Sequence, residues 1–246
     1  MGFATLGLIA LAAFASGILH GATGMAGGIV MASILAHIIG IKAAVPVMTI
    51  ALILSHLSRV LLYFRETDWN IARWVLLFGC PMIVVGAVVF GLISPRTVAI
   101  VFAVFLAVSF PIKRWAKRHE IKTGRKLLAG ASMVWGMLAG NVIGPGFFLA
   151  PFLLGTGMGR MTYVGTLAAI TLVMNVLKSA VFGATDLLTL ELLILGGAIG
   201  LLTMPGNWVG KSILKSMRDQ DHRLAIDIMT ALMIVNFVYL AVVAPT

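Results

Sequence analysis

Two basic side chains lie deep within long apolar runs of the sequence. Arg59 falls in the run 43–64 and Lys178 in the run 161–184. A charge inside a membrane-spanning helix costs at least about 2.5–3.5 kcal/mol and usually faces a cavity or a partner. No Asp or Glu lies in the interior of an apolar run to neutralise either cation. This cationic pair indicates a binding site for an anion, and the alternative is that both side chains snorkel toward the nearer helix end.

A second hydrogen-bonding side chain precedes each cation by one helical turn. His56 stands three residues before Arg59, and Asn175 stands three residues before Lys178. Residues at this spacing share one face of a helix. The sequence therefore predicts, in each half of the chain, a polar helix face suited to the oxygens of a small anion.

Two glycine-rich interruptions of apolar sequence stand 119 residues apart, and we call them the first break (20–28) and the second break (140–146). Backbone groups freed by such a break cost several kcal/mol each if they face lipid, so breaks at membrane depth are packed in protein or line a cavity. Matching breaks in two halves of a chain indicate a transporter substrate site. Helices that restart after a break present free N–H groups and a positive dipole end, which favour an anion.

The breaks supply the other candidate ligands for a substrate. His20 and Thr23 in the first break and Asn141 in the second could bind substrate oxygens or cap freed backbone groups. His20 or His56 could also carry a coupling proton, because histidine titrates near physiological pH. For the glycines, close helix packing is the alternative to substrate binding. The predicted substrate-binding glycines are Gly24, Gly27, Gly28, Gly144 and Gly146.

The composition is that of a membrane protein. The chain is 61% hydrophobic and 11% charged, with a mean hydropathy of +1.08, and apolar stretches long enough to cross a bilayer recur along it. The N-terminus lacks a basic region before its apolar run, so we expect a mature first helix. The net charge of +10 gathers in a few loops, which indicates membrane topology and not nucleic-acid binding. The single cysteine, Cys80, excludes an intrachain disulfide.

The apolar runs follow one plan twice. A first transmembrane repeat (1–112) and a second (127–246) flank a basic cytoplasmic linker (113–126). The shift that aligns the breaks also places Arg59 on Lys178 and Gly91 on Gly210. The predicted helical segments are 3–22, 26–40, 43–64, 70–92 and 96–112 in the first repeat, and 127–140, 146–158, 161–184, 190–210 and 222–244 in the second.

The distribution of charge predicts the orientation. With the linker inside the cell, the basic loops 65–73 and 211–223 also lie inside if each broken pair returns to the side where it starts. Three full crossings per half are an odd number, so the halves must be inverted and both termini lie outside. The predicted fold is an all-α polytopic membrane protein of two inverted-topology repeats. Each repeat is a glycine-broken pair, re-entrant or of short helices, plus three long transmembrane helices.

These glycine patterns resemble the TauE/SafE family of sulfite and organosulfonate transporters. Met25-Ala26 and Phe147 depart from its glycine runs. The resemblance implies movement of a small anion such as sulfite, a short sulfonate or a carboxylate across the bacterial cytoplasmic membrane, often outward. The residues that carry it are Ser16, Gly17, Gly21, Gly24, Gly27 and Gly28 in the first copy, and Gly136, Gly140, Gly144, Pro145, Gly146 and Pro151 in the second.

The predicted function is a secondary transporter that exports an organosulfonate such as sulfoacetate, or sulfite, by alternating access. A passive anion channel and a carboxylate transporter are alternatives. An intramembrane enzyme is a distant one, because no nucleophile–base set, metal cluster or phosphate loop stands out. We expect no cofactor, no metal and no nucleic acid. The expected partners are the anion and the bilayer. A coupling proton or sodium ion and a homo-oligomer both stay open.

Overall fold

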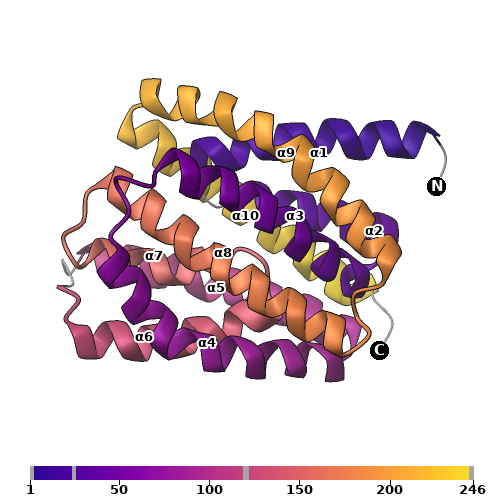
Figure 1. Ribbon diagram of the computed structural model, residues 1–246, viewed down its shortest axis with the longest axis horizontal. Coiled ribbons are helices and arrows are strands. Elements are labelled where there is room, and N and C mark those ends of the chain that lie inside the picture. Colours follow the sequence, from indigo (N-terminus) through magenta and orange to yellow (C-terminus); the bar gives the residue numbers. More distant parts are fainter. Residues whose placement is uncertain (1–2, 24–25, 119–121, 244–246) are drawn as a thin grey trace.

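The computed structural model describes residues 3–23, 26–118 and 122–243, and within these residues it contains ten α-helices and no strand (Figure 1). In chain order they are α1 (Phe3–Thr23), α2 (Ala26–Ile39), α3 (Ile41–Leu62), α4 (Trp69–Leu92), α5 (Pro95–Arg118), α6 (Arg125–Asn141), α7 (Gly146–Leu154), α8 (Arg160–Ala184), α9 (Leu190–Ser216) and α10 (Asp219–Val243). The prediction of an all-α polytopic membrane protein is confirmed.

Five of the described helices are long and apolar enough to cross a membrane: α1, α3, α4, α8 and α9. The helices that follow the breaks are short. At 1.5 Å per residue, α2 with 14 residues and α7 with 9 residues span roughly 21 Å and 14 Å. Neither is long enough to cross the hydrocarbon alone.

Some helix ends differ from the predicted segments. Residues 113–118, predicted as linker, form the last turns of α5, and α9 continues to Ser216 instead of ending near residue 210. Lysine and arginine are good helix formers, and cations are favourable at a helix C-terminus. α7 ends at Leu154, four residues before its predicted end, because Thr156 and Gly157 form a turn.

The helices of the two halves have matching partners. α1 packs along α9 as its counterpart α6 packs along α4, and α3 packs on α9 as α8 packs on α4. The contact of α2 with α10 likewise matches that of α7 with α5. Two counterpart pairs, α3 with α8 and α5 with α10, pack directly on each other. This exchange of partners is the arrangement that an inverted repeat predicts.

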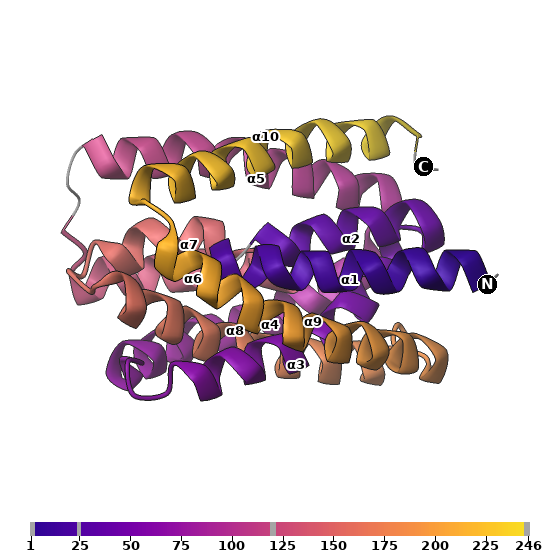
Figure 2. The same ribbon diagram turned by 90° about the horizontal axis from the view of Figure 1, so that it is seen from above.

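The chain directions agree with the predicted topology. Figures 1 and 2 place the beginning of α1 and the end of α10 at one end of the molecule, and the end of α5 and the beginning of α6 at the other. The α3–α4 and α9–α10 connections also lie at this second end. α2 returns toward the end where α1 begins, and α7 toward the end where α6 begins (Figure 2). The halves thus start at opposite ends, as the inverted-repeat prediction demands.

Glycines bring α1 into backbone contact with α9, and α6 with α4. A Cβ added at Gly17 of α1 would lie 2.5 Å from the carbonyl oxygen of Thr203 in α9, and one at Gly136 of α6 would lie 2.3 Å from that of Gly79 in α4. Gly21 and Gly140, one turn later, have equally close contacts, at 2.4 Å. These four glycines therefore serve close helix packing.

The glycines also show where the register of the repeat changes. Gly210 of α9 packs against Gly21, and Gly86 of α4 packs against Gly140 in the same way. Since Gly21 and Gly140 are counterparts, the residue of the other half that corresponds to Gly210 in this packing is Gly86. The prediction that Gly91 is its counterpart is wrong, because the uniform shift between halves fails in α4 and α9.

We expect Gly17→Ala to lower the free energy of unfolding by about 1–3 kcal/mol, because its methyl group must displace the backbone of α9. Gly7→Ala, on the same helix but with nothing within 4 Å of the added Cβ, is the control and should be neutral. Thermal unfolding in detergent, followed by tryptophan fluorescence, measures both variants. Equal stability of the two would show that α1 and α9 do not pack this closely.

Candidate substrate-binding site

The two breaks touch each other in the middle of the molecule. Gly144, between α6 and α7, has φ 77°, a left-handed conformation that favours glycine. A Cβ on it would lie 2.2 Å from Cδ1 of Ile29 in α2, and one on Gly28 would lie 3.6 Å from Cγ2 of Ile143. The start of α2 thus packs on the loop of the second break, so the two breaks meet.

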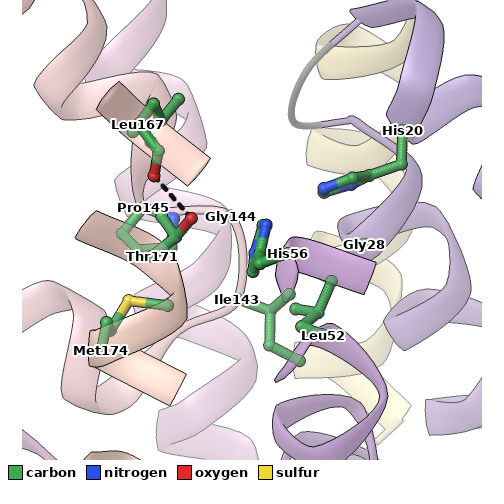
Figure 3. Close-up of a pocket in the computed structure, with 11 residues that line it drawn as sticks. His20, Gly28, Leu52, His56, Ile143, Gly144, Pro145, Leu167, Thr171 and Met174 are labelled. Carbon is green, nitrogen blue, oxygen red and sulfur yellow. Dashed lines mark hydrogen bonds between the residues drawn. The ribbon is translucent and has the colours of Figure 1, made fainter. Parts of the chain in front are cut away.

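A small cavity of about 20 Å³ lies where the breaks meet (Figure 3). A volume of this size holds about one water molecule, whereas sulfite and sulfonates carry three oxygens around a sulfur atom. The cavity in this structure is therefore too small to enclose such an anion. The lining residues are His20, Gly28, Leu52, His56, Ile143, Gly144, Pro145, Gly146, Leu167, Thr171 and Met174.

Five of the predicted site residues line this cavity: His20, Gly28, His56, Gly144 and Gly146. Sequence reasoning missed Thr171 and Met174, which α8 contributes from the side opposite His20 (Figure 3). A signal for Thr171 was present, because it stands four residues before Asn175 and thus on the same helix face.

Arg59 forms a hydrogen bond to His20 across the first break. The guanidinium is only 2% exposed, and its Nη1 lies 2.9 Å from Nε2 of the imidazole. Guanidinium nitrogens only donate, so Nε2 must accept, and the proton of the neutral ring sits on Nδ1. Nδ1 is buried without a hydrogen-bond partner in the described part of the chain. His20 therefore offers an unused N–H donor beside a buried positive charge.

His56 of α3 completes this cluster. Its ring centroid lies 5.1 Å from that of His20, with the rings tilted by 58°. The side chain is 4% exposed, and its Nδ1 also lacks a hydrogen-bond partner among the described residues. Buried polar atoms without partners are costly and rare, so we read these two imidazoles as groups that a ligand satisfies. We call Arg59, His20 and His56 the imidazole–guanidinium cluster.

Lys178 does not reach the cavity. Its ammonium is 1% exposed and donates to the carbonyl oxygens of Ala139 and Val142, both at 3.1 Å. These carbonyls lie at the C-terminal end of α6, where helix carbonyls lack intrahelical partners and the dipole is negative. The structure thus places Lys178 as a cap of the second break, although the sequence predicted that it faces the substrate.

Arg59 and Lys178 nevertheless make equivalent contacts. Each reaches 39 residues back, to His20 and to Ala139, and the repeat aligns these two positions. Where the first half has an imidazole to accept the bond, the second half has a methyl group, so the lysine turns to backbone oxygens. The repeat thus explains why both cations occupy equivalent positions. The difference between His20 and Ala139 explains why Arg59 bonds to a side chain and Lys178 to the backbone.

Two other predicted ligands bond within their own helices. Asn175 donates to the carbonyl of Thr171 at 2.8 Å, and Asn141 donates to that of Met137 at 3.0 Å. Neither residue lines the cavity. The Oδ1 atom of Asn141 is buried without a partner in the described chain. Asn175, the counterpart of His56, therefore does not repeat its role.

Thr23 and Gly27 of the first break have structural roles. The Thr23 hydroxyl donates to the carbonyl of Leu19 at 2.6 Å and accepts from the N–H of Ala26 at 3.1 Å, so it caps the start of α2. A Cβ at Gly27 would lie 2.0 Å from the carbonyl oxygen of Ser16, which makes Gly27 necessary for the packing of α2 on α1. Gly24 lies outside the described residues.

The electrostatics of the interior favour a negative ligand. Among the residues that the structure describes, no Asp or Glu is buried, whereas Arg59 and Lys178 both are. The described part of the chain also has no group of His, Cys, Asp and Glu that could hold a metal ion. An oxyanion is the ligand class that matches buried cations and unused N–H donors.

Comparison with known proteins agrees with this chemistry. The family model described as sulfite exporter TauE/SafE matches residues 9–237, which is nearly the whole chain. No curated protein and no solved structure matches the chain. The family match, together with the apolar helices that can span a bilayer, identifies a multi-pass membrane transporter. The chain belongs to the TauE/SafE sulfite exporter family.

Proposed function

We propose that this protein is a secondary transporter that exports sulfite, or an organosulfonate such as sulfoacetate, across the bacterial cytoplasmic membrane by alternating access. The observation that carries the proposal is the imidazole–guanidinium cluster beside a small cavity between two helix breaks. The family match supports the substrate class and the outward direction.

In the proposed site the anion lies between the breaks. Its oxygens accept hydrogen bonds from Nδ1–H of His20 and from free N–H groups at the start of α2, near Gly28. Arg59 supplies the positive charge and, through its bond to Nε2, directs the proton of His20 to Nδ1. A buried cation attracts an anion far more strongly than an exposed one does, because solvent screens it less.

Alternating access requires two bodies that move against each other. Glycines bring the backbones of α1 and α9, and of α4 and α6, into contact, so we propose that each of these pairs moves as a unit. With α3 on the first pair and α8 on the second, each moving body combines helices from both halves of the chain. We propose that the bodies rock about the α3–α8 contact, where the cavity lies. A cavity too small for the anion favours this carrier over a permanently open channel.

The orientation follows from the basic loops, which gather at one end of the molecule (Figures 1 and 2). We propose that this end faces the cytoplasm and that both termini lie outside, in accordance with the positive-inside rule.

Arg59→Gln should weaken binding of sulfite and sulfoacetate at least about tenfold, since a charge-assisted partner of a buried ligand is worth roughly 1.5–3 kcal/mol. Arg73→Gln removes one positive charge from an exposed position and is the control. Ligand-induced thermal stabilisation of the purified protein measures the effect, because a ligand of the folded state raises its apparent stability. Equal stabilisation of both variants would remove Arg59 from the site.

Lys178→Gln should instead lower the free energy of unfolding by roughly 1–3 kcal/mol, because it weakens the caps on two buried carbonyls. We expect its loss of anion affinity to be smaller than that of Arg59→Gln. The same thermal unfolding measurements, with and without sulfite, test this. Full stability combined with lost binding would place Lys178 in the anion site after all.

A further inference from the structure

We propose that the anion binds together with one proton, and that His56 carries this proton. The inference rests on the proposed transport function and adds the coupled ion to it. Its basis is the different hydrogen bonding of the two imidazoles at the cavity.

Only one of these imidazoles has a free basic nitrogen. The lone pair of His20 Nε2 accepts the hydrogen bond of Arg59, and its other nitrogen carries the N–H. A proton added to His20 would have to break the bond to Arg59 and point an N–H at a guanidinium. Neutral His56 keeps one nitrogen lone pair, and no hydrogen bond within the described chain occupies it. The proton therefore goes to His56.

The charges make the two binding events depend on each other. A proton on His56 creates a second buried cation on the same helix face as Arg59, three residues away, and like charges repel strongly where solvent is excluded. A monovalent anion in the cavity cancels the added charge. Anion and proton thus raise the affinity for each other, and this coupling is reciprocal. The loaded site carries the same net charge as the empty one.

The surroundings offer no competing carrier. Among the residues that line the cavity, only His20 and His56 have a side chain that can take up a proton. Other titratable groups on the helices packed against α3 do not line it. A sodium ion would need several oxygen ligands, but Thr171 supplies the one side-chain oxygen of the lining. Among the described side chains, the titratable groups on α3 and its packing partners that do not line the cavity are His37 on α2, Lys42, Arg59 and Tyr63 on α3, Arg96 and Arg118 on α5, Tyr163 and Lys178 on α8, and Glu191 and Lys211 on α9.

Joint binding of one proton and one monovalent anion makes transport electroneutral. The membrane potential then does not drive the cycle, and the sum of the anion and proton gradients sets its direction. Export occurs when the anion is accumulated inside by a larger factor than the proton is accumulated outside. This suits a protein that discharges an anion formed in excess within the cell.

Isothermal titration in buffers of different ionisation enthalpy counts the protons taken up per bound anion. Isethionate is the first probe, because its sulfonate stays ionised and any proton uptake belongs to the protein. Sulfite is the second, with its own ionisation measured in the same buffers. We expect uptake that approaches one proton per anion at alkaline pH, and an affinity that falls about tenfold per pH unit there.

Three histidine variants assign the proton. His56→Gln should bind with no proton uptake and without the pH dependence, whereas His20→Gln should bind more weakly but keep the uptake. His37→Gln is the matched control, because His37 bonds to Asn236 away from the cavity, and it should behave as the wild type. Because His20→Gln is informative by itself, the test holds even if His56→Gln fails to fold.

Uptake that persists in His56→Gln, or that disappears in His20→Gln, would overturn the assignment to His56. Anion binding without any proton uptake in the wild type would overturn proton coupling and leave the transport proposal standing. Binding of neither isethionate nor sulfite would count against the proposed function itself.

Discussion

The hydrogen bond between Arg59 and His20 joins the two costly features of this chain, a buried cation and a broken helix. A guanidinium inside a membrane protein is stable only with partners, and a break at membrane depth is stable only when its polar groups face protein or a cavity. Here Arg59 finds its hydrogen-bond acceptor at the break, in His20, and the break has one of its polar groups satisfied by Arg59. The bond also determines which nitrogen of His20 remains available, so it shapes the chemistry of the cavity as well as the stability of the fold.

The two halves use the same frame for different purposes. Arg59 and Lys178 reach back to equivalent positions in α1 and α6, yet only the first half has an imidazole there. The second half uses its cation to close the carbonyl end of α6, and Asn175 bonds within α8 where His56 faces the cavity. Hydrogen-bonding chemistry is thus concentrated in the first half, while the second half supplies Gly144, Thr171 and Met174 as the opposite wall.

Much of the fold could be predicted from the sequence, because apolar runs, glycine breaks and basic loops are local signals. The burial of Arg59 and Lys178 and the meeting of the breaks also follow from such signals. The role of Lys178 could not be predicted in this way. It depends on the residue that faces the cation across the break, which is His20 for Arg59 but Ala139, without a side-chain acceptor, for Lys178. An alignment of the halves at one constant shift could not identify Gly86 as the counterpart of Gly210 either. The packing of α4 and α9 on their neighbours, and not the spacing in the sequence, determines which residues correspond.

The central claim is that the imidazole–guanidinium cluster lies in the substrate site of a carrier. Counterflow of radiolabelled sulfite into proteoliposomes preloaded with unlabelled sulfite tests it most directly, with Arg59→Gln measured alongside. A carrier returns its site more rapidly when it is loaded, so we predict saturable uptake that the internal sulfite accelerates and that Arg59→Gln loses. Uptake that rises linearly with concentration, without acceleration and equally in both proteins, would contradict the account and indicate a channel independent of this cluster.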